Sequence, residues 1–135
     1  MPGDESDGDR CAFSQISTKS AASASQHETW RFTLAEIRVA AVQLPSLEGM
    51  DLDGACQVVA DATAGLSGSD LVLLPEMWTP GYFDFDRYHA SAESASKVRT
   101  FLSDRARELG AHLHGGSFVE QRGDEFYNTS LLFDP

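Results

Sequence analysis

One stretch of the sequence decides how the whole chain is interpreted: LVLLPEMWTPGY, residues 71–82. The four large aliphatic residues 71–74 predict a strand that is buried on both faces of a sheet. Pro75 has no N–H to donate to a neighbouring strand, so the strand should end there. Glu76 is then expected just beyond the carboxyl end of the strand, where open α/β sheets bind their ligands. The sequence therefore predicts a functional position for Glu76.

The residues before this stretch predict a strand followed by a helix. Residues 37–44, IRVAAVQL, are mostly aliphatic and are followed by Pro45, which is typical of a strand and its end. An amphipathic helix is predicted next, because apolar or small side chains recur at spacings of three and four. Its buried face consists of Leu52, Cys56, Val59, Thr63 and Leu66. Asp51 is the expected N-cap, and Gly65 and Gly68 are expected to end the helix.

The residues after it predict an aromatic-rich loop, a second helix and two more strands. The loop covers residues 78–89, and the helix follows from an apolar stripe that ends at Gly110. The stripe consists of Val98, Phe101, Leu102, Ala106 and Leu109. Residues 111–119 and 126–133 should form strands joined by a turn at residues 121–125. The predicted order is β-α-β-α-β-β.

This alternation predicts the α/β class, with a parallel or mostly parallel sheet and an antiparallel hairpin at the end. A dinucleotide-binding fold is the obvious alternative for such a chain. That fold needs a Gly-x-Gly-x-x-Gly turn after its first strand, whereas this sequence has LPSLEG at residues 44–49. Dinucleotide binding is therefore not expected.

Composition and charge limit the class of protein. The 135 residues carry a formal net charge of −11, with Lys and Arg few and scattered, which argues against nucleic-acid binding. No apolar run approaches the roughly 18 residues that span a bilayer, and the start of the chain does not look like a secretory signal. We therefore expect a cytoplasmic protein that binds neither nucleic acid nor membranes.

The chain divides into two parts by composition. Residues 1–35 open with acidic residues and continue as a Ser/Ala-rich stretch with few large apolar side chains. Such a segment buries too little surface to offset the entropy lost on ordering, so we expect a disordered tail. Residues 36–135 are expected to form a single folded unit.

Two groups of residues resemble a known family. The first is PEMWTPGY, residues 75–82, in which the acid follows an aliphatic strand. The second is HGGSFVE at residues 114–120, followed by YNTS at residues 127–130. Together they are similar to motifs of the carbon–nitrogen hydrolase (nitrilase) superfamily, and the resemblance runs in register from about residue 37 to residue 135.

The resemblance implies a fold and an activity. The family fold is a four-layer α-β-β-α sandwich, and this chain would be its N-terminal part. The family hydrolyses small amides or nitriles without a cofactor, through a Glu-Lys-Cys triad, and usually forms homo-oligomers. Glu76 matches the general base of that triad. The lysine and the cysteine lie farther along a family chain, so the alternative is a truncated, catalytically incompetent fragment or a non-catalytic binding subunit.

Three aromatic residues are predicted to line a substrate pocket. Trp78, Tyr82 and Phe83 follow Glu76 on the loop and should partly desolvate its carboxylate. An aromatic cluster is at least as often plain packing, so this interpretation stays open.

The remaining motif residues are expected to act as scaffold. Gly115 and Gly116 allow another backbone or a helix to approach closely. Asn128 and Ser130 have side chains that satisfy buried polar groups. A structural role is expected for all four rather than a catalytic one.

No cysteine or histidine of the chain is expected to supply a nucleophile or a metal site. Cys56 lies on the apolar stripe of a helix, where cysteine behaves as a small hydrophobe, and Cys11 lies in the tail. His112 and His114 share one face of a strand but have no third ligand at a suitable spacing. The acidic loop at residues 84–89 is expected to be solvated.

Overall fold

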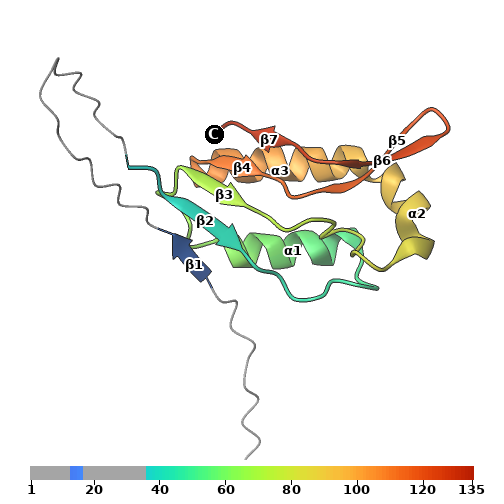
Figure 1. Ribbon diagram of the computed structural model, residues 1–135, viewed down its shortest axis with the longest axis horizontal. Helices are drawn as coiled ribbons and strands as arrows, with labels where there is room; N and C mark the ends of the chain where they lie inside the picture. Colours follow the sequence, from blue (N-terminus) through green and yellow to red (C-terminus); the bar gives the residue numbers. More distant parts are fainter. Residues whose placement is uncertain (1–12, 17–35) are drawn as a thin grey trace, which may run out of the picture.

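The computed structural model describes residues 13–16 and 36–135, which form two β-sheets and the helices that pack beside them (Figure 1). Along the chain the elements are β1 (Phe13–Ile16), β2 (Val39–Val42), α1 (Leu52–Thr63), β3 (Leu71–Leu73), the 3-10 helix η1 (Phe85–Arg87), α2 (Tyr88–Glu93), α3 (Ala95–Leu109), β4 (His112–His114), β5 (Phe118–Arg122), β6 (Glu125–Thr129) and β7 (Leu132–Phe133). The predicted α/β class is confirmed.

The larger sheet is mixed. Its five strands have the order β1-β2-β3-β4-β7. β2, β3 and β4 are parallel and are connected through helical segments, as the alternation predicted. β1 and β7 pair antiparallel at the two edges. The register places Ala40, Val72 and Leu113 in one row across the three parallel strands.

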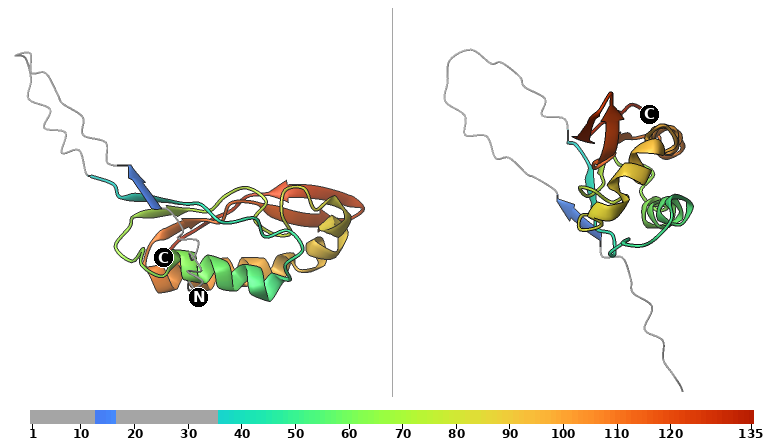
Figure 2. Two further views of the ribbon diagram at one scale, coloured as in Figure 1. Left: turned by 90° about the horizontal axis from the view of Figure 1, so that it is seen from below. Right: turned by 90° about the vertical axis from the view of Figure 1, so that its right-hand side faces the viewer.

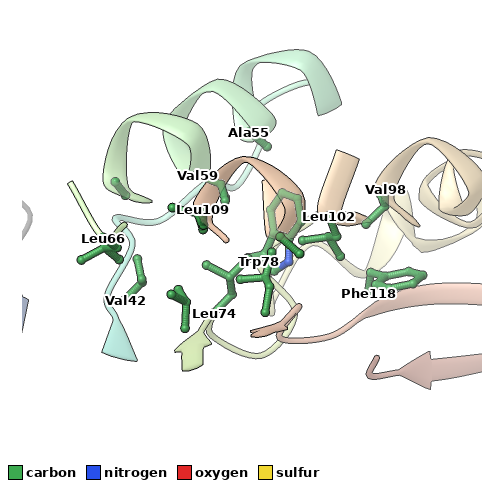
Figure 3. Packing of buried hydrophobic residues seen from close by; sticks show 14 of the residues in the cluster. Val42, Ala55, Val59, Leu66, Leu74, Trp78, Val98, Leu102, Leu109 and Phe118 are labelled. Atoms are coloured by element: carbon green, nitrogen blue, oxygen red, sulfur yellow. The ribbon is translucent and has the colours of Figure 1, made fainter. Parts of the chain in front are cut away.

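The main core lies between this row and the two long helices. α1 and α3 both run along one face of the sheet (Figure 2). Val72 and Leu113 are 0% exposed, as is Leu102 on α3. Figure 3 shows Leu102 among the other apolar side chains of this core. Burying a side chain of this size stabilises the fold by about 2 kcal/mol. The helices therefore hold the parallel strands, and the carboxyl ends of those strands, in fixed places.

Arg105 of α3 joins the two helices. Its Nε donates to Thr63 Oγ1 at 2.7 Å, and its second terminal nitrogen donates to the carbonyl oxygen of Ala60 at 3.1 Å. Carbonyl groups in the last turn of a helix lack partners within the helix. The guanidinium group therefore satisfies the end of α1 while it fixes α3 beside it.

The predicted helix ends are confirmed where a specific residue forms the cap. The side chain of Asp51 accepts a hydrogen bond from the N–H of Gly54 at 2.8 Å and so caps α1. Gly110 ends α3 in the left-handed conformation, with φ of 61°.

Two predicted strands are wrong as single elements. Residues 111–119 form β4 and β5, which belong to different sheets, because the chain turns at Gly115 and at Gly116, whose φ is 62°. Residues 126–133 likewise divide into β6 and β7. The predicted loop at residues 78–89 contains η1 and the first two residues of α2. The hairpin β5–β6 thus leaves the main sheet and lies beside α2 (Figure 1).

The other face of the main sheet carries side chains that are only partly covered by the residues described. Val39, Leu71 and Leu73 are half-buried, and Ala41 is exposed. Leu132 on β7 is 60% exposed. Neither long helix lies on this side (Figure 2). We call this side, defined by these five residues, the open face.

The N-terminal part of the chain is described only at β1, which pairs with β2. Most of the range 1–35, for which the sequence predicts disorder, lies outside the described residues, so that interpretation stays a prediction. Among the helices that the structure describes, none combines the length and apolar character needed to cross a bilayer.

Candidate active site

Glu76 lies at the carboxyl end of β3, as the sequence predicted. The backbone stays beside β4 as far as Leu74, whose N–H donates to the carbonyl oxygen of His114 at 3.0 Å. The Glu76 side chain is exposed, although the sequence predicted partial desolvation. Its Oε1 accepts a hydrogen bond from Nδ2 of Asn128 at 2.9 Å. A carboxylate from the main sheet therefore meets a carboxamide from the hairpin.

The backbone around Glu76 is held by Gly116 and its neighbours. A Cβ atom on Gly116 would lie 1.9 Å from the carbonyl oxygen of Pro75, so no other residue permits this approach. Met77 has φ of 49°, which is unusual for a residue with a side chain, and its N–H donates to Ser117 Oγ at 3.0 Å. The hydroxyl of Ser130 donates to the carbonyl oxygen of Gly116 at 2.7 Å. The predicted close packing at Gly116 is confirmed.

Gly115 makes a second close approach, to α3. A Cβ atom there would lie 2.6 Å from Cδ1 of Leu102. Its carbonyl oxygen accepts a hydrogen bond from Trp78 Nε1 at 2.9 Å. These two contacts join the residues before β5 to the core.

Trp78, predicted as a pocket residue, lies in that core. It is 3% exposed, belongs to the main apolar cluster and has its ring centre 6.2 Å from that of Phe101 (Figure 3). Its hydrogen bond to Gly115 satisfies the buried indole N–H. Trp78 thus fixes the chain two positions after Glu76.

Tyr82 and Phe83 lie on the surface beside the candidate site. Tyr82 is 52% exposed and lines a pocket next to Glu76. Phe83 is 71% exposed and touches Tyr82 edge-on, with ring centres 5.0 Å apart. Phe83 is not among the residues that line the pockets beside Glu76.

The first pocket has aromatic walls and a polar end. It encloses about 330 Å³, a volume in the range of small-molecule sites. Its lining residues are Glu76, Met77, Tyr82, Phe85, Tyr88, Val119, Phe126, Tyr127 and Asn128. We call it the aromatic pocket. Its walls come from two segments, the η1–α2 region and the hairpin, which are far apart in the sequence.

Tyr88 ties the first of these walls together. Its hydroxyl donates to the carbonyl oxygen of Tyr82 at 2.6 Å, and its ring centre lies 5.4 Å from that of Phe85. Desolvation raises the pKa of Tyr88, and the nearby charges of Asp84 and Glu76 raise it further. The phenol is therefore a neutral hydrogen-bond donor near neutral pH.

The second pocket is lined by more polar side chains and also lies beside Glu76 and Asn128. It encloses about 270 Å³ and is lined by Leu74, Glu76, His114, Gly116, Ser117, Asn128 and Ser130. We call it the polar pocket. Glu76 and Asn128, which are hydrogen-bonded to each other, line both pockets.

A serine and a histidine meet in the polar pocket without forming a catalytic pair. Ser130 Oγ lies 2.9 Å from His114 Nε2. The hydroxyl hydrogen of Ser130 is already directed to the carbonyl oxygen of Gly116, so His114 is the donor in their contact. An activated serine nucleophile needs the opposite arrangement.

Cys56 lies on α1, partly buried against the core. Burial, with a smaller contribution from the negative charge of Asp53, raises the pKa of its thiol to about 11. Because the thiolate is the reactive form, Cys56 is poorly suited to be a nucleophile. The position of Cys11 lies outside the described residues.

The histidines of β4 make no metal site in this structure. His112 lies 3.5 Å from Asp134, and His114 contacts Ser130. Within the part of the chain that is described, no group of three or more His, Cys, Asp or Glu side chains is arranged to hold a metal ion.

Glu120 holds the hairpin against α3. It forms ion pairs with Arg99 of α3 and with Arg122, and it accepts a hydrogen bond from Thr129 Oγ1 at 3.1 Å. Desolvation raises the pKa of Glu120, but the hydrogen bonds from Arg122, Arg99 and Thr129 outweigh it and lower the pKa overall. This network fixes the strand that carries Asn128.

Sequence reasoning missed the contact of Asn128 with Glu76 and that of Ser117 with Met77. Both residues lie in the motifs that resemble the family, but their contacts join positions 52 and 40 residues apart. Local periodicity reports which face of an element is buried, not which distant residue it touches. The carboxamide of Asn128, which directly follows Phe126 and Tyr127 in β6, is the signal that was available.

Most of the chain matches a protein-family model. The carbon–nitrogen hydrolase family model matches residues 38–135, which include both pockets. Among curated proteins, the 2-oxoglutaramate amidase of Paenarthrobacter nicotinovorans is 37% identical over 105 residues, covering 74% of this chain and 36% of that protein. The omega-amidase NIT2 of Xenopus tropicalis is 31% identical over 106 residues, covering 76% and 37% respectively. The chain therefore spans about a third of the length of these relatives.

Two solved structures share the fold. The CN-hydrolase superfamily protein XC1258 from Xanthomonas campestris, which has an arsenic adduct in its active site, aligns with a TM-score of 0.60 and 25% identity over 68% of this chain and 34% of its own. Nit3 of Saccharomyces cerevisiae, of the nitrilase superfamily, aligns with a TM-score of 0.57 and 29% identity over 73% and 40%.

Proposed function

Because this chain belongs to the carbon–nitrogen hydrolase family, as the match over residues 38–135 shows, we propose that it supplies the general base of an enzyme that hydrolyses small amides. The observation that carries the proposal is the position of Glu76. It follows the parallel strand β3, whose central residue Val72 is fully buried; it is exposed and lines two pockets, and one of its oxygens accepts a hydrogen bond from Asn128. The relatives named 2-oxoglutaramate amidase and omega-amidase support an amide as substrate.

The chemistry proposed for Glu76 is proton transfer to and from a thiol nucleophile. A thiol with a pKa of about 8.5 is mostly protonated at neutral pH, so a base that removes its proton during attack accelerates the reaction. The sulfur bonds to the amide carbon, and the proton taken by Glu76 passes to the departing nitrogen as the C–N bond breaks. Glu76 then takes a proton from water, whose oxygen bonds to the acyl carbon and displaces the sulfur, and it returns that proton to the departing thiolate.

The lysine and the cysteine of the triad come, in this proposal, from polypeptide that follows residue 135 in a family chain. The lysine would stabilise the negative oxygen of the tetrahedral intermediate. Cys56, with a thiol pKa of about 11, is not assigned the nucleophilic role. Trp78 supports the Glu76 backbone from the core, while Tyr82 and, at the periphery, Phe83 are proposed to contact the substrate.

The four-layer α-β-β-α sandwich is proposed for the completed domain. In such a fold a second sheet would pack on the open face, where Leu71 and Leu73 are half-buried and Leu132 is 60% exposed. Apolar sheet faces are normally covered in stable proteins.

A test of the base assignment compares two glutamate-to-glutamine variants in the active protein that contains this chain. Glu76→Gln should abolish hydrolysis of 2-oxoglutaramate and simple aliphatic amides while the thermal unfolding midpoint is retained. Glu93→Gln, at an exposed position of α2, is the matched control and should retain full activity. Retained activity in Glu76→Gln would sink the assignment.

The second candidate function is that of a non-catalytic subunit that pairs with another chain. The open face favours it, because exposed apolar side chains on a sheet promote association. Light scattering on the purified chain tests this candidate. Association into a defined complex without any amidase activity would support it, and a stable, compact monomer would argue against it.

A further inference from the structure

Glu76 presents its two carboxylate oxygens to different surroundings. Oε1 accepts the hydrogen bond from Asn128 Nδ2 at 2.9 Å. Among the described residues, Oε2 makes no hydrogen bond with the protein. An acid that acts as a base needs one oxygen free to receive the proton and a fixed direction in which to receive it. We propose that Asn128 is a positioning residue, which fixes Oε1 of Glu76 so that Oε2 is the basic atom.

The hairpin holds Asn128 rigidly enough for this role. Asn128 lies on β6, directly opposite Val119 of β5, which is 4% exposed. The next residue, Thr129, bonds to Glu120, which is paired with Arg99 on α3. The carboxamide is therefore connected to the main helical layer through two short links, and its position does not depend on an exposed loop.

The backbone of Glu76 is fixed from the same side. Met77 is bonded to Ser117, and Gly116 lies against Pro75. The backbone and the side chain of the acid are thus both held by residues 116–130. Without Asn128 the backbone would stay in place while the exposed side chain sampled other rotamers, which lowers the fraction of productive encounters.

The experiment measures kcat and KM of the active protein that contains this chain, since the inference rests on the proposed function. Asn128→Leu keeps the size of the side chain and removes the donor, and we expect kcat to fall about 10–100-fold with little change in KM. Gln121→Leu is the matched control, because it removes a carboxamide from the same hairpin that bonds only to Gly123. An unchanged kcat in Asn128→Leu overturns the inference.

Asn128→Asp tests whether a loss of activity comes from losing the hydrogen bond to Glu76 or from disturbing the fold. At neutral pH an ionised aspartate has no proton to donate, so activity should be low; at acid pH a protonated carboxyl group can donate to Glu76 as the amide did. We expect the activity of Asn128→Asp relative to wild type to rise as the pH falls, and that of Asn128→Leu to stay constant. The other titratable groups lining the two pockets are Tyr82, Tyr88, Tyr127 and His114, which are the same in all variants. Equal pH profiles for both variants would contradict the proposal.

A readout that needs no catalysis uses this chain alone. Asn128 is the only asparagine in the sequence, so selective ¹⁵N-Asn labelling gives a single side-chain nitrogen signal. Glu76→Gln should shift that signal, and Glu93→Gln should leave it unchanged. Suppose that Glu76→Gln is inactive, but that Asn128→Leu keeps its kcat and Glu76→Gln does not shift the Asn128 signal. The positioning role then fails while the base assignment stands. If Glu76→Gln is active, the proposed function itself fails.

Discussion

The hairpin β5–β6 is entered at Gly116 and turns at Gly123, and the two glycines differ only in their surroundings. Both have φ of 62°. A Cβ atom at Gly116 would lie 1.9 Å from the Pro75 carbonyl oxygen, whereas one at Gly123 would meet nothing within 4 Å. At the turn, Gly123 is needed only for its left-handed conformation. At the entrance to the hairpin, Gly116 is needed for that conformation and also because its backbone lies against Pro75. The comparison shows that close packing of the Gly116 backbone against the Pro75 backbone fixes the position of Glu76.

The largest loss of stability is expected from adding a side chain at Gly116, where the hairpin begins. Gly116→Ala adds both the cost of a left-handed residue and an overlap with backbone that cannot move away, so we expect a loss of more than about 4 kcal/mol in the free energy of unfolding. Gly123→Ala should cost only about 1–2 kcal/mol, for the conformation alone. Urea unfolding of both variants measures the difference. Equal losses would break the comparison.

A smaller effect is expected at Gly115, where the close neighbour is a side chain. A Cβ atom there would lie 2.6 Å from Leu102 Cδ1, which can shift at the expense of core packing. We expect Gly115→Ala to cost about 1–3 kcal/mol by thermal or urea unfolding. Combining it with Leu102→Ala, which makes room, should cost less than the sum of the two single changes. If the two losses of stability were strictly additive, the contact with Leu102 would not be the reason for glycine at position 115.

The ion pairs of Glu120 with Arg99 and Arg122 stabilise the hairpin, and the free energy that they contribute should depend on pH. Glu120→Gln is expected to lose about 1–2 kcal/mol at pH 7. Because the folded pKa of Glu120 is lowered from 4.5, its stabilisation is present above that value and is lost as pH falls through the lower folded pKa. The stability difference between wild type and variant should therefore shrink below pH 4.5 in urea titrations. A difference that does not depend on pH would contradict this.

The smallest effect is expected at the turn end. Glu125→Gln changes an exposed glutamate whose contact is the hydroxyl of Tyr127, so the free energy of unfolding should change by less than about 0.5 kcal/mol. The hydrogen bond to Glu125 raises the pKa of Tyr127, and desolvation adds to it. The variant should lower that pKa, which phenolate absorbance during an alkaline titration detects. A large loss of stability would mean that the side chains near the turn, contrary to this expectation, contribute to the packing of the hairpin.

The sequence predicted those features that local physical chemistry controls. The strand predicted at residues 71–74, the cap at Asp51 and the helix end at Gly110 depend on nearest neighbours; the strand is found at Leu71–Leu73, and the cap and the helix end are found as predicted. The division of residues 111–119 was missed, because two adjacent glycines in a strand pattern also fit an uninterrupted strand with a bulge.

The candidate site was predicted at Glu76 but not in its surroundings. Trp78 is two positions from Glu76, yet the left-handed conformation of Met77 between them separates an exposed acid from a buried indole. Asn128 reaches the acid from a different sheet. Contacts of this kind follow from tertiary packing, which a single sequence does not report.

The hydrogen bonds described around Glu76 have a consequence for the order of synthesis. The supports of Met77, Trp78 and Glu76 lie 40, 37 and 52 residues later in the chain. While a ribosome is still making α3, the acid has already been made, but Gly116, Ser117 and Asn128 do not yet exist. A nascent chain halted at Gly110 contains Glu76 but none of the residues that make these hydrogen bonds. Glu76 and its neighbours can therefore gain these hydrogen bonds only after the hairpin has been made, so chains interrupted before that point lack the residues that support the candidate site.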